Sequence, residues 1–392
     1  MCYAAMVEQN AHKLKEQFQA VIDYRQISDV LQFKKLAGER LKLSPGVVDG
    51  FSRDFGPGDR EVIELFESNL ALQFSLLDEE IGENQNQLER LRYEQLQKTT
   101  KTIEKKIGVL ERKLQSLENK KLSVAGQTND KSYIYPHWNF LAVANVNGQN
   151  LIQNFEYGHF RDTGNILEDL LYSAGKHPLN KRYGLYNTKL ESLDPNYFEE
   201  IRRNLNSSEM KREQERSLRW DDFKRGVGIF TGSRKKFLER ELNLLGIGEQ
   251  YIQNEKLSTK SIWEPLFLKQ RAVVVAKSFQ ESVLKSDYFK DPQIEDDKHI
   301  PVEFFMQGGD AVYFPAVFSR KTFPQQTKSY ISIVTTLPRP EVEDKGHDRS
   351  PIALTKEGAR KYLSGEIASF KDFKILASQE SDLREFYSRP RA

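Results

Sequence analysis

The chain has 392 residues and a formal net charge of +2, with 38% hydrophobic and 30% charged residues. This length suits one large domain with insertions or two to three ordinary domains, and so small a net charge does not by itself indicate a nucleic-acid-binding protein. No run of about 18 apolar residues and no apolar signal-peptide core are present, so the sequence predicts a cytoplasmic protein without a membrane span.

The N-terminus carries the only cysteine of the chain, Cys2, directly after Met1. One cysteine cannot form an internal disulfide, and no histidine or cysteine pair has the spacing of a metal site, so neither a metal nor another cofactor is expected. If Met1 is removed, Cys2 has an amine and a thiol on adjacent carbons. The amine of such an aminothiol condenses with an aldehyde to form an imine. The thiol then attacks the imine carbon and closes a five-membered thiazolidine ring. The alternative is an incidental cysteine at a frayed terminus.

The first half of the chain is predicted to be mostly helical, from about residue 11 to 42 and again from about 62 to 123. The second segment has a heptad pattern, which predicts a long helix or an antiparallel helical hairpin. We expect this coiled-coil-like arm to be an insertion over residues 60–128 that packs on its own domain, binds a protein partner or self-associates. The apolar positions of the heptad are Ile103, Ile107, Leu110, Leu114 and Leu117.

After residue 130 the pattern changes to short runs typical of β-strands. Asn147-Gly148 and Gly308-Gly309 are typical of turns between them. Residues 196–260 interrupt the pattern with a charged, mostly helical stretch, and 201–240 hold 12 Lys and Arg against 6 Asp and Glu. The latter segment either meets phosphates or is a solvated surface. The sequence thus predicts an α+β fold, as one domain over 1–392 with insertions at 60–128 and 196–260. The strand-like runs are FLAVANV, RYGLYN, QRAVVVAKSF, AVYFPAVF and SYISIVTTL.

Polar residues that suit acid–base chemistry come at the ends of these runs. Glu281 follows an apolar strand, where burial would raise the pKa of its carboxyl. His347 and Arg349 are two residues apart, so in an extended segment they would share a face and suit a phosphate-bearing substrate. Asn187, Lys189 and Glu191 occupy alternating positions too, so in an extended segment they would also share a face. Each group taken singly also fits a structural role.

In their order along the chain, these segments resemble the SOS response-associated peptidase (SRAP) family, the abasic-site processing proteins. That family begins with Met-Cys and has the elements N-A-R-x-E-T, R-C-[LIV]-x-P-A-x-G-F-Y-E-W and H-x-R-M-P. The resemblance covers residues 1–20, 130–195 and 260–365. The corresponding segments here are Met1-Cys2, Asn187 to Ser192, Arg271 to Glu281 and His347 to Pro351, and Pro136 to Asn139 and Phe155 to Gly158 resemble the P-R-Y-N and R-W-G elements of the family.

The chain departs from the family pattern at several positions that would touch DNA. Tyr3-Ala4 replace Gly-Arg after the cysteine, and Lys189 replaces an arginine, which keeps the charge but loses bidentate phosphate geometry. Glu156 stands where the family has another arginine, and Ser282 where it has tryptophan. We therefore expect a different DNA footprint, to which the basic 201–240 segment contributes.

The resemblance implies a core of curved, barrel-like antiparallel sheets and a DNA-repair enzyme of the DNA-damage response. Its partner would be ring-opened abasic sites, in single-stranded DNA, and its product a covalent thiazolidine crosslink to Cys2. Autocatalytic removal of Met1 (a peptidase, hence hydrolase, activity) and a lyase activity are also implied. In the roles that the family implies, Glu281 moves protons, His347 assists ring opening and Asn187 orients the amine, while Arg349 and Lys189 bind phosphates and Trp138, Asn139 and Tyr157 contact DNA, with Trp138 or Tyr157 stacked on a base.

Two other classes of function stay open at this point. The chain could be a cysteine peptidase acting on other proteins, with Cys2, His347 and Asn187 as its catalytic groups. It could instead be a non-catalytic DNA-binding or scaffold protein that recruits partners through the helical arm. A heat-stable adduct with abasic DNA, formed without borohydride, separates the first interpretation from both.

Overall fold

The computed structural model consists of two compact units. One unit consists of residues 1–23 and 133–392, and the other of residues 24–132. The predicted single domain over 1–392 stays a prediction. The described residues are 4–36, 45–98, 100–124, 133–158, 187–193, 214, 218, 264–294, 297–323, 326–381 and 385–390.

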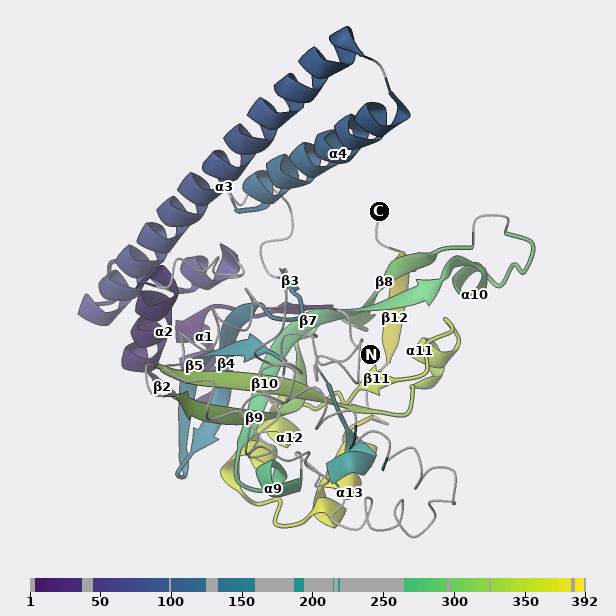
Figure 1. Ribbon diagram of the computed structural model, residues 1–392. Coiled ribbons are helices and arrows are strands. Elements are labelled where there is room, and N and C mark those ends of the chain that lie inside the picture. The colour runs from purple at the N-terminus through teal and green to yellow at the C-terminus, as the bar shows by residue number, and fades with distance from the viewer. Residues whose placement is uncertain are drawn as a thin grey trace. The chain divides into compact units, whose positions relative to one another are not determined.

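A closed barrel forms the centre of the first unit (Figure 1). Its strands are β4 (Asn139–Val146), β5 (Gln149–Tyr157), β7 (Arg271–Leu284), β9 (Val312–Phe323) and β10 (Gln326–Thr336). Antiparallel pairing runs from β5 through β4, β7 and β9 to β10. Parallel pairing of β10 with β5 then closes the ring.

The apolar runs of the sequence account for these strands. Residues 271–276 in β7 are all buried, and side chains from every barrel strand meet in one apolar core. Asn147 and Gly148 join β4 to β5 with φ angles of 52° and 83°, the left-handed backbone that two-residue hairpins need. The α+β class and the barrel-like sheet are confirmed. Most neighbouring strands of the barrel pair antiparallel, and β5 pairs with β10 in parallel, because no hairpin joins these two strands and fixes their direction.

Shorter strands extend the barrel sheet near the N-terminus of the chain. β1 (Ala4–Val7) lies between β7 and β3 (Tyr133–Ile134), with Ala4 opposite Gln280 and Met6 opposite Tyr133. The opposite edge of the same part of β7 pairs with β8 (His299–Met306), and β8 in turn pairs with β12 (Phe386–Pro390). The further short strands are β2 (Val21–Ile22), which pairs with β5, and β6 (Asn187–Lys189) and β11 (Ser350–Pro351), which both pair with β10.

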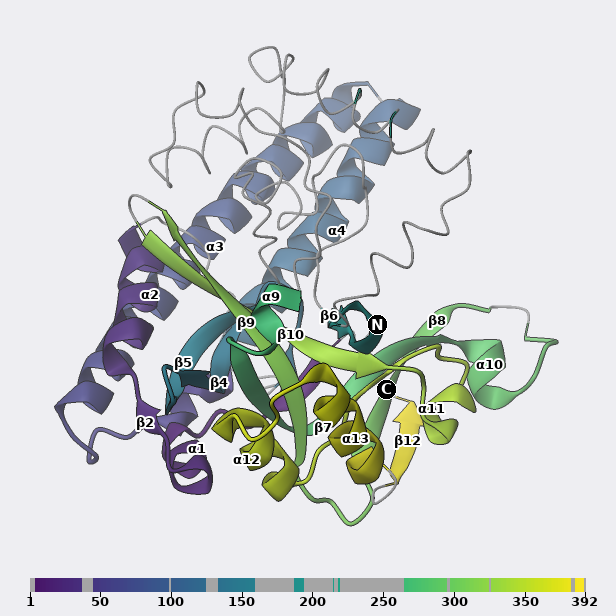
Figure 2. The same cartoon turned by 90° about the horizontal axis from the view of Figure 1, so that it is seen from below.

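Helices of the first unit pack on the barrel, as α12 does against β7 and β9 (Figure 2). Three of them begin at a side-chain cap that satisfies an orphan amide, at Asn10, Thr355 and Ser369. No described helix is long and apolar enough to cross a bilayer. The helices are α1 (Ala11–Phe18), α9 (Glu264–Phe267), α10 (Lys285–Phe289), α11 (Pro340–Glu343), α12 (Lys356–Ser364) and α13 (Phe370–Ser381), with the 3-10 turn η2 (Leu190–Leu193).

The second unit consists of α2 (Tyr24–Leu36), the 3-10 turn η1 (Pro45–Gly50), α3 (Pro57–Gln97) and α4 (Lys101–Val124). Helices α3 and α4 are antiparallel, because Arg92 pairs with Glu111 near one end of the contact and Asp78 with Lys121 near the other. The predicted hairpin is thus confirmed. Its leucine seam consists of Leu88, Leu91, Leu110 and Leu114, with Ile81 and Ile107 packed against it.

Two predictions fall on parts of the chain that the structure does not describe. Nearly all of the insertion at 196–260, with its basic 201–240 segment, lies outside the described residues. The strand-like RYGLYN run does so too, except for Asn187 in β6. The described residues therefore do not test either prediction.

Candidate functional site

Among the described acids of the site, Glu281 has the pKa that departs most from its ordinary value. Its side chain lies near the end of β7, where only 1% of the residue is exposed. Burial raises the pKa of the Glu281 carboxyl from 4.5 to about 8, and the negative charge of Asp348 acts in the same direction. The carboxyl therefore holds a proton at neutral pH. A protonated acid with a pKa near the working pH suits general acid–base chemistry.

His347 faces this carboxyl. Its Nε2 atom lies 3.2 Å from Oε2 of Glu281, and its Nδ1 atom lies 2.8 Å from the backbone oxygen of Arg349. The second contact assigns the proton of the neutral ring to Nδ1, which leaves the Nε2 lone pair toward Glu281. Burial lowers the pKa of the His347 imidazole. Both groups are therefore neutral near pH 7, and the Nε2 lone pair lies 3.2 Å from the protonated carboxyl.

The chain places His347 there by a tight turn after α11. Gly346 has a φ angle of 83°, a conformation that L side chains rarely adopt. A Cβ atom at this position would also lie 2.5 Å from the Cβ atom of Asp287 in α10. The backbone amide of His347 donates to the carbonyl of Val342 at 3.3 Å. Glycine at 346 is thus needed both for the turn and for the close approach to α10.

Arg349 points to a different partner. Its guanidinium donates from Nη1 and Nη2 to the two carboxylate oxygens of Glu191, at 3.2 and 3.0 Å, and from Nε and Nη2 to Thr335. Burial acts to raise the pKa of Glu191, but the hydrogen bonds from buried Arg349 lower it overall. The expectation that His347 and Arg349 share a face is wrong, because the chain bends at Asp348 and becomes a strand only at Ser350. The phosphate-binding role of Arg349 stays a prediction.

The remaining predicted catalytic residues are described only in part. β6 places the backbone of Asn187 opposite Ile333 and that of Lys189 opposite Thr335, but the side chain of Asn187 lies outside the described atoms. Lys189 is exposed, near enough to Glu191 for its charge to help lower the pKa of that carboxyl. Cys2 also lies outside the described residues, which begin at Ala4. The structure therefore brings together Glu281 with His347, and Arg349 with Glu191.

Two of the three predicted DNA-contacting residues in the barrel belong to its interior instead. Tyr157 is fully buried, with its ring edge-on to Phe140, and Asn139 is buried and accepts a hydrogen bond from Asn154 at 3.0 Å. Neither side chain presents a surface to a base, so both assignments are corrected. Trp138 is partly buried and packs edge-on against Tyr135 with ring centroids 5.3 Å apart. Its stacking role stays a prediction.

A second buried carboxylate, Glu303 on β8, was missed. It accepts hydrogen bonds from Ser278 at 2.6 Å and from the hydroxyl of Tyr133, and Arg389 pairs with it at 3.3 Å. Burial raises the pKa of Glu303, although Arg389 acts in the opposite direction. The sequence does contain a signal, because Glu303 interrupts the apolar run VEFFM. An acid inside a strand needs partners when it is buried.

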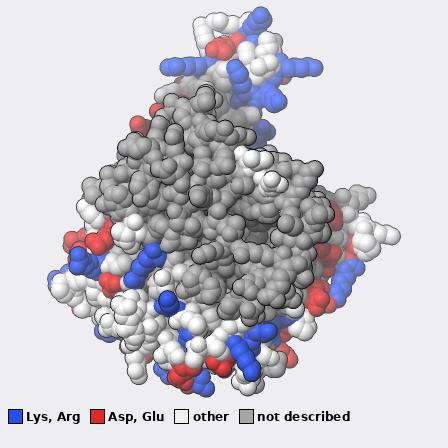
Figure 3. Space-filling view, turned by 60° about the horizontal axis from the view of Figure 1, so that its bottom comes forward, with Lys and Arg blue, Asp and Glu red and all other residues white. Residues whose placement is uncertain are grey.

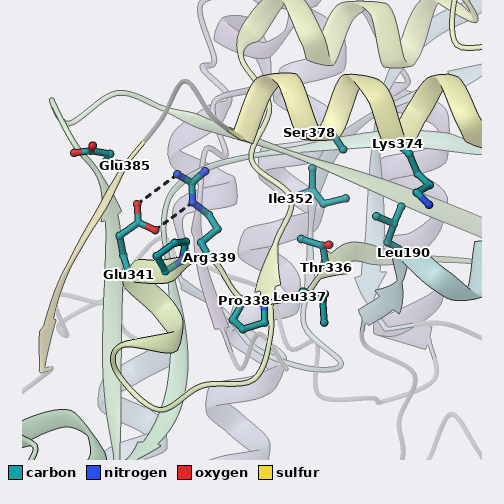
Figure 4. Close-up of a pocket in the computed structure, with 12 residues that line it drawn as sticks. Leu190, Thr336, Leu337, Pro338, Arg339, Glu341, Ile352, Lys374, Ser378 and Glu385 are labelled. Carbon is teal, nitrogen blue, oxygen red and sulfur yellow. Dashed lines mark hydrogen bonds and ion pairs between the residues drawn. The ribbon is translucent and has the colours of Figure 1, made fainter.

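A cleft of about 720 Å³ adjoins the Arg349 side of the site (Figure 4). Leu190, Thr336 and Ile352 connect it to the elements described above. Arg339 and Glu341, which both line the cleft, pair with each other at 3.4 Å. The charges of these two lining residues are therefore already satisfied by each other. Neither Glu281 nor His347, the two predicted catalytic residues whose side chains are described, lines it. Among the described side chains no group of three or more could hold a metal ion, and those visible in Figure 3 mix both signs of charge.

Comparison with known proteins gives one match to a family model. Residues 247–388 match the model "SOS response associated peptidase (SRAP)", a range that includes Glu281, His347 and Arg349 but neither Cys2 nor Asn187. No curated protein is significantly similar to the chain.

Several solved structures are similar to the chain at low identity. A protein from Bacteroides thetaiotaomicron is 11% identical over 66% of this chain and 77% of its own, with a TM-score of 0.35. A protein from Bordetella bronchiseptica is 9% identical over 67% and 87%, with a TM-score of 0.37. A phage-related protein from the same organism is 13% identical over 67% and 83%, with a TM-score of 0.35.

Proposed function

We propose, from the premise that residues 247–388 of this chain belong to the SOS response associated peptidase family, that the protein captures abasic sites in DNA covalently through Cys2. The family supports a role associated with DNA repair. The finer statement, a thiazolidine crosslink to ring-opened abasic sites in single-stranded DNA, is the proposal. The observation that carries it is the neutral Glu281–His347 pair beside the strand that leads back to Cys2.

Chain connectivity limits how far Cys2 can lie from the strand that carries Glu281. Ala4 lies opposite Gln280, the residue before Glu281, and Cys2 precedes Ala4 by two residues. Because consecutive Cα atoms are about 3.8 Å apart, the Cα atom of Cys2 lies within about 8 Å of that of Ala4. Within this radius an amine and a thiol could reach an acid that holds a proton at neutral pH. This juxtaposition supports a reaction in which a carbonyl oxygen must leave as water.

The proposed reaction proceeds in two bond-forming steps. The deprotonated amine of Cys2 attacks the C1′ aldehyde, and the resulting hydroxyl leaves as water with the proton of the Glu281 carboxyl. Loss of water leaves a protonated imine, and the Cys2 thiolate adds to the imine carbon while the nitrogen keeps its proton. The net change is the loss of one water. Glu281 is left as a carboxylate, and His347 can relay a proton from solvent back to it, because the Nε2 lone pair lies 3.2 Å from that carboxyl.

Other residues would bind or position the DNA in this proposal. Asn187 would orient the amine, exposed Lys189 would contact a phosphate, and Trp138 would stack on a base. A phosphate would have to compete with the Glu191 carboxylate for Arg349, so we infer that the first role of Arg349 is to hold Glu191 and the loop carrying His347. The same groups would remove Met1 by hydrolysis, which frees the Cys2 amine. A lyase activity would follow if the imine between Cys2 and the abasic sugar underwent elimination, which breaks the DNA strand, before the thiol closes the ring.

The decisive experiment is adduct formation with an oligonucleotide that carries a single abasic site, without borohydride, followed by heating and a denaturing gel. We expect a stable adduct with the native chain, none with Cys2→Ala and at most a borohydride-trapped imine with Cys2→Ser. A tetrahydrofuran abasic analogue, which has no aldehyde, is the control. An equal yield of adduct with Cys2→Ala contradicts the proposal. Cleavage of added peptides without an adduct supports the peptidase alternative, and reversible binding alone supports the scaffold.

A further inference from the structure

Three planar side chains are stacked in a row on β8 and β12. The rings of Phe305 and Tyr387 lie directly opposite each other, with centroids 5.1 Å apart and planes inclined by 15°. The guanidinium carbon of Arg389 lies 4.3 Å from the centroid of Phe305. These three residues are called the β8–β12 stack. Near-parallel aromatic rings, and a guanidinium over a ring face, attract each other at such distances.

The stack faces solvent rather than the core. Residues alternate between the two faces of a strand, and Phe304 and Phe386 occupy the core face of the same two strands. Tyr387 is 50% exposed and the side chain of Arg389 is 63% exposed. Among the described strands β12 pairs with β8 alone, and Figure 1 shows it beside β8. The outer members of the row are therefore open to a ligand.

A buried anchor holds the row in place. Nη2 of Arg389 lies 3.3 Å from Oε2 of Glu303, whose side chain is buried and also accepts a hydrogen bond from Ser278. The guanidinium is thus fixed in its stacked orientation before any ligand arrives. A preorganised group loses less conformational entropy on binding than a free surface arginine does. A guanidinium has five N–H donors, so donors remain for a phosphate.

We propose that the β8–β12 stack binds unpaired bases of single-stranded DNA, with a base on the ring of Tyr387 and Arg389 at an adjoining phosphate. Aromatic faces beside a fixed cation are the means by which proteins bind single strands without reading sequence. This proposal rests on the proposed function and extends it to the nucleotides that flank the abasic site.

The position of the stack fits this role. Phe305 lies opposite Ser278 on β7, three residues before Glu281, which is roughly 10 Å along the strand. The stack and Glu281 are on opposite faces of the sheet, because Glu281 lies opposite buried Val302 while Phe305 faces outward. A strand captured at Cys2 would therefore pass the end of β1 to reach Tyr387. The bases held there would be neighbours of the abasic nucleotide.

The test measures reversible affinity in the full chain carrying Cys2→Ala, with an oligothymidine that has no abasic site, by fluorescence anisotropy at several salt concentrations. We expect Tyr387→Ala to weaken binding by about 5- to 150-fold, the usual contribution of a stacked base, and Tyr387→Phe to stay within twofold. Arg389→Gln should flatten the dependence of log K on log salt by about one unit. The matched control is Tyr93→Ala on α3, which is 64% exposed and should bind as the parent does.

Equal affinities for Tyr387→Ala and Tyr93→Ala, in variants with unchanged circular dichroism, would overturn the stack as a base-binding surface. The same holds if Tyr387→Phe loses as much affinity as Tyr387→Ala, because the aromatic plane would then not be what binds. Neither result involves Cys2 or an abasic site. Failure of covalent capture is measured separately, with the abasic oligonucleotide and the native chain, so the two failures are distinguishable.

Discussion

The two units of the chain use charged residues in opposite ways. In the barrel unit, Glu281 and Glu303 are buried among apolar strands, and burial raises the pKa of both carboxyls. In the helical unit, charges such as those of Arg92 and Glu111 pair on the surface, while leucines form the seam between α3 and α4. A buried carboxyl changes its protonation state near neutral pH, whereas an exposed pair does not. The acid–base chemistry therefore belongs to the barrel.

The largest effects are expected from the buried pair. Glu281→Gln and His347→Ala should each slow adduct formation by about 10²- to 10⁴-fold, because each removes a positioned proton-transfer group. In the native chain the rate should fall as the pH rises through about 8, since the Glu281 carboxyl then loses its proton. Single-turnover rates with abasic DNA measure both. The control is Glu111→Gln, an exposed acid of α4. Rates within twofold of native for both barrel variants would remove the distinction between the two units.

The leucine seam should govern the stability of the arm without affecting chemistry. Leu114→Ala should destabilise the α3–α4 hairpin by roughly 2–5 kcal/mol, because it removes a buried side chain and leaves a cavity. Leu96→Ala, at a position that is 86% exposed, should change stability by no more than about 0.5 kcal/mol. Hydrogen exchange of α4 amides reports the difference. A slowed crosslinking rate in the seam variant would show that the arm contributes to the reaction.

Buried Glu281 should also make stability depend on pH. Its folded pKa of about 8 is raised above the ordinary 4.5, so the folded chain retains a proton that the unfolded chain releases. As the pH rises from about 4.5 to 8, the native chain should therefore become less stable relative to the Glu281→Gln variant. The stability advantage of the variant over the native chain should be largest at about pH 8 and above. Thermal unfolding of both proteins at pH 5 and 8.5 measures this. An equal difference at the two pH values would mean that Glu281 is not held protonated.

The smallest effect is expected on the surface of the arm. Arg92→Ala removes an exposed pair with Glu111 and should cost between 0 and about 1 kcal/mol, with less effect at high salt. Denaturant unfolding at low and high ionic strength tests it. A cost above about 2 kcal/mol would show that the charges of the arm hold its helices together as strongly as the leucines do.

Features that depend on local periodicity could be predicted from the sequence. The alternating spacings of three and four from Ile103 to Leu117 predicted the helical hairpin, because a heptad needs a facing helix. Glu281 directly after an apolar strand predicted a buried acid with a raised pKa, and both its burial and its pKa agree. These inferences need only the neighbours of each residue in the chain.

Features that depend on distant segments could not be predicted in this way. The pairing of β5 with β10 and the partner of Arg349 arise from residues far apart in the sequence. The DNA contacts of Tyr157 and Asn139 rest on the resemblance to short family elements, which does not show on which face of its strand a side chain lies, and both residues are buried. Glu303 was missed because its partners come from three other strands, β3, β7 and β12.

Intact mass spectrometry of the native chain after reaction with an abasic oligonucleotide tests the central proposal most directly. We predict one heat-stable product, formed without a reducing agent, whose mass equals the chain without Met1 plus the oligonucleotide minus one water. Fragmentation should place the DNA on Cys2. A product that retains Met1, carries the DNA on a lysine, or forms equally with Cys2→Ala would contradict the account.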